Sequence, residues 1–200
     1  MRSLALVLLL SLVACTAEAE EPWEPQVGDV IFHTSTSAQS QAIQEATDSR
    51  WSHVGMLVKH EGSIGVLEAV QPVRVVTLES WLARGEDRAF AVYRSKTRLS
   101  PEKRKALEAA GREHLGKDYD LYFGWDDTLI YCSELVWKAY SEGLGIELSA
   151  PRPLADFDLS SPTVQALMKK RWPNGVPDQK AVSPQDLADS ALLQRVAGSR

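Results

Sequence analysis

The chain has 200 residues, of which 44% are hydrophobic and 24% are charged, a balance typical of one globular domain with a substantial core. Its formal net charge of −5 at pH 7 gives no electrostatic support for a nucleic-acid partner. The four histidines are scattered and no Cys-x-x-Cys or His-Glu-x-x-His spacing occurs, so we expect neither a metal nor a cofactor. A glycine-rich phosphate loop and the Gly-x-Ser-x-Gly elbow of serine hydrolases are also absent.

The N-terminus has the composition of an export signal. A short positive start, Met1-Arg2-Ser3, precedes an apolar run from Leu4 to Ala14 that is too short to span a membrane comfortably. We therefore expect residues 1–19 to be a signal peptide and residues 20–200 to form a single domain that is periplasmic or secreted.

The signal has two candidate ends. Leu12-Val13-Ala14-Cys15 resembles a bacterial lipobox, which predicts cleavage after Ala14 and an outer-membrane lipoprotein tethered through a lipidated Cys15. Ala17-Glu18-Ala19 has instead the small-x-small pattern of ordinary cleavage near Ala19. With either end, Cys132 has no disulfide partner in its own chain.

The first half of the mature chain has the pattern of a sheet. Apolar alternation between turn residues predicts strands at residues 27–32, 51–59, 66–70, 73–76 and 89–93. Short helices are expected at residues 41–47 and 78–83.

The second half is predicted to be helical. Ser100-Pro101 is an N-cap followed by proline at the first helical position, which predicts a helix over residues 102–115 with Gly116 as its stop. Helical spacing predicts three more helices, one from Cys132 to Gly143 or Gly145, one at residues 162–170 and one at residues 183–196. Strands followed by helices, without repeats, indicate one α+β domain.

Cys132 is the candidate nucleophile. It lies where a loop enters a helix, and the backbone N–H groups and positive end of a helix lower the pKa of a thiol. A free cysteine is more commonly a small buried apolar residue, so this assignment depends on a base elsewhere in the chain.

His53 is the best candidate for that base. It lies inside an apolar strand between Ser52 and Val54, and Gly55 leaves room for another group to approach the backbone. The other three histidines, His33, His60 and His114, are interpreted as solvated surface residues.

Glu68 is the third candidate. A carboxylate within the apolar strand Val66-Leu67-Glu68-Ala69-Val70 would be costly to bury without a partner. Since one turn separates this strand from that of His53, antiparallel pairing can put both side chains on one face of the sheet, where Glu68 would orient the imidazole. The alternative is that Glu68 points outward into water.

Two blocks of the sequence resemble the NlpC-type cysteine peptidases of the papain-like superfamily, which cleave amide bonds in bacterial cell-wall peptides. The nucleophile block is Leu115-Gly116-Lys117-Asp118-Tyr119, then Gly124 and Cys132-Ser133-Glu134-Leu135-Val136. The base block is Gly28-Asp29-Val30-Ile31-Phe32, then His53-Val54-Gly55-Met56 and Glu68-Ala69. In the ordinary family the cysteine block comes first, whereas here it comes second.

That inverted order is the order of a circular permutation, as in the YiiX/YaeF-like group of exported bacterial proteins. The resemblance implies a circularly permuted papain-like (NlpC-type) fold, in which a central antiparallel sheet packs against the helix carrying the nucleophile. It also implies Cys132 as nucleophile, His53 as general base and Glu68 as orienting residue. Many NlpC-type enzymes have His, Asn or Gln at this third position, so the glutamate is a departure from the pattern.

Four further residues are considered through the same resemblance or through their place beside Cys132. Tyr119 matches the family's active-site tyrosine and is expected to hold the oxyanion of a tetrahedral intermediate together with the Cys132 backbone N–H; its alternative role is that of a packed aromatic residue. Tyr131 and Ser133 flank the thiol and are expected to line the site. Asp29 is interpreted as a turn residue.

Together with these residues, the resemblance implies a cysteine hydrolase that cleaves a small peptide or acyl amide, such as a peptidoglycan fragment. Two other functions remain open: a lipid acyltransferase or esterase of the lecithin:retinol acyltransferase-like type, and a non-catalytic periplasmic module that binds a peptide or lipid. For the lipid alternative, an apolar groove could be lined by Trp51, Trp81, Trp125 and Trp137, although aromatic residues at such positions are usually part of the core. The pocket's shape is expected to depend on residues 35–49 and 151–158.

Overall fold

A six-stranded antiparallel sheet forms the centre of the protein, whose computed structural model describes residues 23–199. The strand order is β10-β5-β1-β2-β3-β4. The strands are β1 (Val30–His33), β2 (His53–His60), β3 (Ser63–Glu68), β4 (Arg74–Thr77), β5 (Phe90–Ser95) and β10 (Leu193–Gly198). The predicted signal peptide and Cys15 lie outside the described residues.

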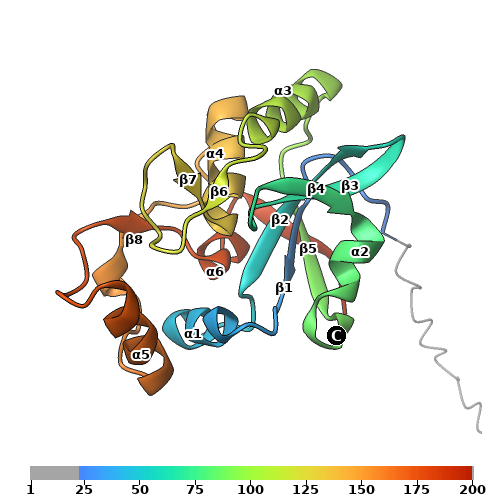
Figure 1. Cartoon of the computed structure of the whole chain (residues 1–200). Helices are drawn as coiled ribbons and strands as arrows, with labels where there is room; N and C mark the ends of the chain where they lie inside the picture. Colours follow the sequence, from blue (N-terminus) through green and yellow to red (C-terminus); the bar gives the residue numbers. More distant parts are fainter. Residues whose placement is uncertain (1–22, 200) are drawn as a thin grey trace, which may run out of the picture.

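Helices cover both faces of this sheet (Figure 1). They are α1 (Ala38–Thr47), α2 (Leu78–Ala83), α3 (Pro101–Arg112), α4 (Cys132–Leu144), α5 (Pro162–Arg171) and α6 (Pro184–Ala188). Short pairs complete the fold: β6 (Asp118–Tyr119) with β7 (Leu129–Ile130), and β8 (Arg152–Pro153) with β9 (Lys180–Ala181). Within residues 23–199, every helix is too short or too polar to cross a membrane. The α+β fold with a central antiparallel sheet is as predicted.

Alternating side chains of the strands build two cores. On one face, residues such as Phe32 and Met56 pack against Leu107 of α3 and Leu135 of α4. On the other face, a smaller cluster packs around Trp81 of α2. A fully buried leucine such as Leu107 or Leu135 contributes about 1.5–3 kcal/mol relative to exposure. The larger core therefore holds α4, the helix that begins with Cys132, against the sheet.

The helix α4 matches its prediction closely. Its buried residues recur at helical spacing, and it ends where Gly145 adopts a left-handed conformation with φ of 66°. Tyr140 donates a hydrogen bond of 2.6 Å from its hydroxyl to the carbonyl of Gly28, which ties the helix to the turn before β1. Asp29, interpreted as a turn residue, is in addition buried and bound by both Nε and Nη2 of Arg94, each at 2.7 Å.

The predicted helix over residues 183–196 is wrong beyond residue 188. α6 begins as expected, because Ser183 Oγ accepts from the Asp186 N–H at 3.1 Å and Asp186 Oδ2 accepts from the Ser183 N–H at 2.7 Å. The chain then turns, and Leu193–Gly198 pairs with β5 at the edge of the sheet. This pairing joins residues about a hundred positions apart, so the local spacing of apolar residues does not reveal it.

Candidate active site

His53 and Glu68 meet at the ends of adjacent strands. His53 is the first residue of β2, Glu68 is the last residue of β3, and His53 Nε2 lies 2.9 Å from Glu68 Oε2. The Met56–Leu67 register puts both side chains on one face of the sheet. The predicted juxtaposition is confirmed, and the alternative of an outward-pointing Glu68 is wrong because its side chain is fully buried.

Two arginines share the carboxylate of Glu68. Glu68 Oε1 accepts from Arg84 Nη2 at 2.6 Å and lies 3.5 Å from Arg74 Nε. Burial acts to raise the pKa of Glu68, but the hydrogen bond and charge of His53, followed by those of Arg84, lower it to about 2. Glu68 is therefore ionised at neutral pH. The sequence analysis identifies neither arginine. The signal for Arg74 was the pairing of β3 with β4, which places this residue directly opposite Glu68.

Cys132 is the buried first residue of α4, and its thiol lies beside the His53 ring. Burial acts to raise the pKa of the thiol, but the hydrogen bond and positive charge of His53 lower it below its usual value. The Val54 backbone N–H, which bonds the sulfur, acts in the same direction. Since His53 Nε2 faces Glu68, Nδ1 is the ring nitrogen left for the thiol.

The His53 imidazole is held in its charged form. Burial acts to lower its pKa, but hydrogen bonds and charges of Cys132 and Glu68 raise the pKa of His53 to about 9. The arrangement therefore favours a thiolate–imidazolium pair at neutral pH, which is the reactive state of a nucleophilic cysteine.

His33 corrects the interpretation of the remaining histidines. Instead of lying at the surface it is 2% exposed, stacks on Trp81 with ring centroids 4.0 Å apart, and lies beside His53 at 5.1 Å. Burial, and then the positive charges of His53 and Arg84, lower the pKa of His33 to about 3. A neutral ring thus forms one wall of the site. The pairing of β1 with β2, which places His33 opposite His53, was the signal that could have revealed it.

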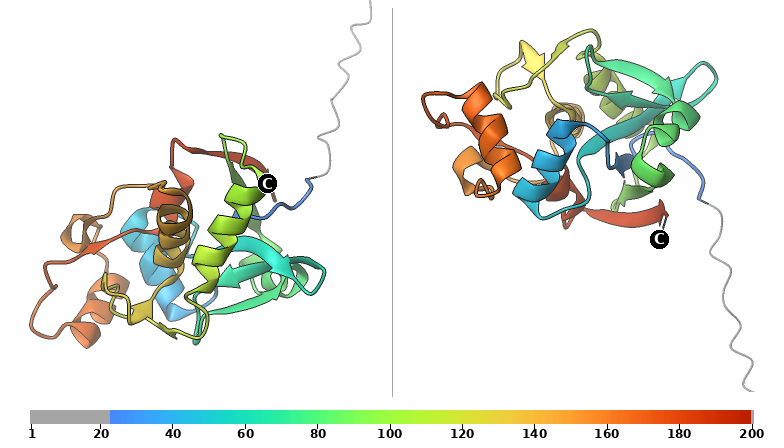
Figure 2. Two further views of the ribbon diagram at one scale, coloured as in Figure 1. Left: turned by 90° about the horizontal axis from the view of Figure 1, so that it is seen from above. Right: turned by 60° about the horizontal axis from the view of Figure 1, so that its bottom comes forward.

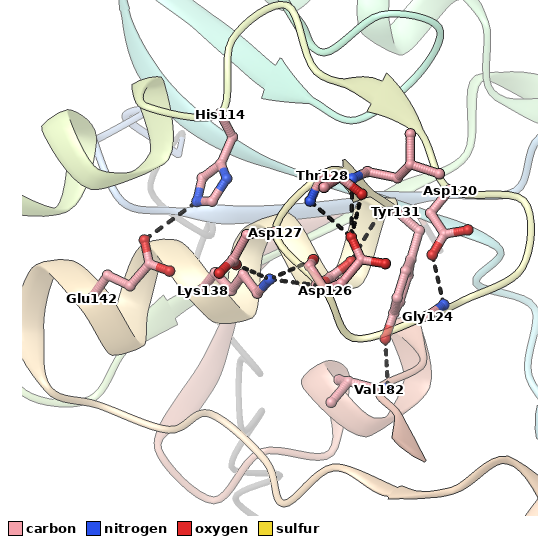
Figure 3. A network of polar contacts seen from close by, with 12 residues as sticks. His114, Asp120, Gly124, Asp126, Asp127, Thr128, Tyr131, Lys138, Glu142 and Val182 are labelled. Carbon is pink, nitrogen blue, oxygen red and sulfur yellow. Dashed lines mark hydrogen bonds and ion pairs between the residues drawn. The ribbon is translucent and has the colours of Figure 1, made fainter. Parts of the chain in front are cut away.

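His114 is likewise not at the surface. It is buried, and its Nε2 lies 3.3 Å from Glu142 Oε2 of α4 (Figure 3). His60 is partly exposed. Among residues 23–199, neither His60 nor His114 forms a hydrogen bond with Cys132, His53 or Glu68.

The three remaining predicted residues surround Cys132 in different ways. The Tyr119 hydroxyl accepts from Gln39 Nε2 at 3.0 Å and also lies beside the Cys132 sulfur. Tyr131 Oη accepts from the Val182 N–H at 3.0 Å, and Ser133 Oγ donates to the Val182 carbonyl at 2.7 Å. Tyr131 and Ser133 therefore tie the segment before α6 to the start of α4.

A buried lysine fixes the loop that leads into the thiol (Figure 3). Lys138 Nζ lies 2.8 Å from Asp127 Oδ1, 3.1 Å from the Asp126 carbonyl and 2.8 Å from Glu134 Oε1. Glu134 Oε2 in turn accepts from the Tyr131 N–H at 3.3 Å. These contacts join the first turn of α4 to the preceding loop, so the position of Cys132 is set from both sides.

An apolar pocket of about 680 Å³, including its open mouth, reaches Cys132. Its walls come from α1, from the segment around Leu154 and Phe157, and from α5, while Tyr131 and Ser133 flank the sulfur. The expectation that residues 35–49 and 151–158 shape the pocket is confirmed. The groove role of the four tryptophans is wrong and the core role is confirmed, because Trp51, Trp81, Trp125 and Trp137 pack in or against the cores. Among the described residues that line the pocket, the tryptophan is Trp172.

The chain is similar to YiiX over nearly its whole length. A protein named "Uncharacterized protein YiiX" from Escherichia coli strain K12 is 44% identical over 193 residues, which cover 96% of this chain and 94% of the relative. A crystal structure titled "metalloprotein yiiX from Escherichia coli O157:H7" has a TM-score of 0.86 at 44% identity, covering 88% of this chain and 99% of that one. In residues 23–199 of the present chain, no three His, Cys, Asp or Glu side chains are arranged to hold a metal ion, so no step is assigned to one.

Residues 24–197 match the family described as permuted papain-like amidase enzymes, YaeF/YiiX, C92 family. That span contains the whole sheet, the helix bearing Cys132 and the strands bearing His53 and Glu68. The inverted order of the two motif blocks is the order of this permuted fold. The chain belongs to the YaeF/YiiX family of permuted papain-like amidases.

Proposed function

We propose that the protein is an exported cysteine amidase in which Cys132 is the nucleophile, His53 the general base and acid, and Glu68 the orienting residue. The observation that carries this proposal is the buried chain of contacts from the thiol through the imidazole to the carboxylate. A protein that only bound its ligand would have no need for this arrangement, because burying an ion pair of this kind is costly.

The proposed reaction has two halves. The Cys132 thiolate attacks the carbonyl carbon of an amide, and the negative charge that develops on the oxygen is held by the Cys132 backbone N–H and the Tyr119 hydroxyl. The His53 imidazolium then gives its proton to the leaving amine, which departs as the thioester forms. Neutral His53 next takes a proton from water, the hydroxide attacks the thioester, and the acid product leaves as the thiolate–imidazolium pair is restored.

The proposed substrate is a small peptide or acyl amide, such as a fragment of peptidoglycan. The proposed location is the periplasm or the outside of the cell, reached through the signal at residues 1–19. Cleavage after Ala14 with a lipid on Cys15 would tether the enzyme to the outer membrane, whereas cleavage near Ala19 would release it. The mass of the mature N-terminus distinguishes these two forms.

An acyltransferase or esterase acting on lipids is the second candidate, and the pocket favours it. Most side chains that line this pocket are apolar, among them Ile43, Ala46, Phe157, Val164, Leu167 and Met168. Such a pocket beside a thiolate would accept an acyl chain through the hydrophobic effect. The same chemistry at Cys132 serves both candidates, so the substrate decides between them.

The test compares wild type with Cys132→Ser on muropeptides, acyl amides and acyl esters, with the products identified by mass spectrometry. We expect amide turnover in wild type and none in the variant. Turnover on esters alone would favour the lipid candidate. Equal turnover by both proteins would refute the assignment of Cys132.

A further inference from the structure

The hydroxyl of Tyr119 has two hydrogen-bond neighbours but only one proton. Gln39 Nε2 lies 3.0 Å from Tyr119 Oη, and the Cys132 sulfur is the second neighbour. A tyrosine hydroxyl can therefore donate to one of them while it accepts from the other. Tyr119 can act as a donor at the reacting centre only if its proton points toward Cys132.

Arg171 determines the direction of this proton. The oxygen and nitrogen of a glutamine amide are hard to distinguish, so the hydrogen-bond network must assign them. Arg171 Nη2 lies 2.5 Å from Gln39 Oε1, and a guanidinium only donates, so the atom that faces it must be the carbonyl oxygen. The Gln39 amide nitrogen then faces Tyr119 and donates to its hydroxyl oxygen, which leaves the tyrosine proton for Cys132.

The two residues come from helices that lie outside both motif blocks. Gln39 belongs to α1 and Arg171 to α5, and these helices lie side by side (Figure 2). Both helices line the pocket that reaches Cys132. Arg171 also lines the apolar pocket, where its guanidinium lies 5.3 Å from the centre of the Phe123 ring. The contact between α1 and α5 therefore joins the pocket wall to the thiol.

We propose that Arg171 and Gln39 are positioning residues, which together direct the hydroxyl proton of Tyr119 toward the Cys132 sulfur and toward the oxyanion that forms beside it. The inference rests on the proposed amidase function and adds to it the origin of the second oxyanion donor. It is consistent with the pKa of Tyr119, which burial and then the nearby Cys132 thiolate raise well above its usual value. Tyr119 stays protonated and can donate throughout the reaction.

Gln39→Glu tests this directly. The new carboxylate has nearly the same shape and keeps Arg171 as its partner, but it only accepts hydrogen bonds. Tyr119 must then donate to residue 39, and its proton turns away from the sulfur. We expect kcat on an acyl amide to fall by as much as the loss of one oxyanion donor allows, about 10²–10³-fold, with little change in KM. Tyr119→Phe should show a similar loss.

Two further measurements separate positioning from a general structural effect. Alkylation of Cys132 by iodoacetamide forms no oxyanion. In Gln39→Glu the sulfur loses the hydrogen bond from Tyr119, so alkylation should move to higher pH, but its rate once the thiol is fully ionised should not fall below that of wild type. The double variant Tyr119→Phe with Gln39→Glu should lose no more activity than either single variant, because both remove the same donor. Thermal unfolding of each variant checks that the fold is intact.

The outcomes distinguish this inference from the proposed function. If wild type and Cys132→Ser turn over the amide equally, the proposed function fails, and this inference fails with it. If wild type depends on Cys132 but Gln39→Glu keeps the full kcat, the positioning role alone is overturned. A loss of alkylation as large as the loss of turnover, measured at a pH where the thiol is fully ionised, would also overturn it, since the substitution would then disturb the site as a whole and not the oxyanion donor.

Discussion

Glu68→Gln isolates the electrostatic role of the third residue. The substitution removes a negative charge from a fully buried position 2.9 Å from His53 while keeping the size of the side chain. An opposite charge within about 4–6 Å shifts a pKa by roughly 1–3 units, so His53 should lose its proton at a pH lower by about that amount. Each unit corresponds to about 1.4 kcal/mol of lost stabilisation of the imidazolium. Arg74 and Arg84, which are partly exposed, can be solvated in the variant.

The assay is the pH dependence of kcat/KM on an amide substrate. Because the pKa of His53 is raised to about 9, wild-type activity should decline only as the pH rises through about 9. In Glu68→Gln this alkaline decline should move to lower pH by about 1–3 units. Glu79→Gln, at an exposed position on α2, changes the net charge equally and serves as the control. An unchanged alkaline decline in Glu68→Gln would refute the role of its charge.

Three predictions concern stability, each measured by urea unfolding. The pKa of His53 is raised from 6.5 to about 9, so the stabilisation that its ion pair supplies is complete below pH 6.5 and is lost as the pH rises through about 9; His53→Gln should remove this dependence. Lys138→Met should cost about 3–5 kcal/mol where Glu134 is ionised, by leaving its carboxylate buried without its cation. Lys138 lowers the pKa of Glu134, which is about 7 in wild type, so this pKa rises in the variant and the cost should shrink as the pH falls toward 7; a cost that does not vary with pH would contradict this. Gly55→Ala should cost about 1–3 kcal/mol, because a Cβ there would lie 2.5 Å from Val66 Cγ1; wild-type stability would exclude the clash.

Much of the site follows from residue patterns that are local in the sequence. The apolar strands around His53 and Glu68, with one turn between them, predict antiparallel pairing, and the structure has that pairing. The cap and the glycine at the ends of the two long helices likewise locate α3 and α4, although α3 ends at Arg112, before Gly116.

Other features depend on contacts that no local pattern encodes. The local spacing of apolar residues predicts a helix where β10 lies. The strand forms because it pairs with β5, a segment far away in the chain that the local spacing does not reveal. The sequence places His33 at a strand end, which suggests a surface position. Its burial depends on α2, which folds over the sheet and stacks Trp81 on the His33 ring. Gln39 and Arg171 were not identified at all, since α1 and α5 meet only in the folded protein.

Ionisation of the Cys132 thiol by its contact with His53 is the step on which the proposed mechanism depends. It is tested most directly by the ultraviolet absorbance of the thiolate as a function of pH, in mature protein without residue 15, where Cys132 is the remaining cysteine of the two in the chain. We predict that wild type already contains thiolate at neutral pH and that in His53→Ala ionisation moves to about pH 8.5 or above, the range of an unassisted thiol. Identical titration of the two proteins would contradict the account.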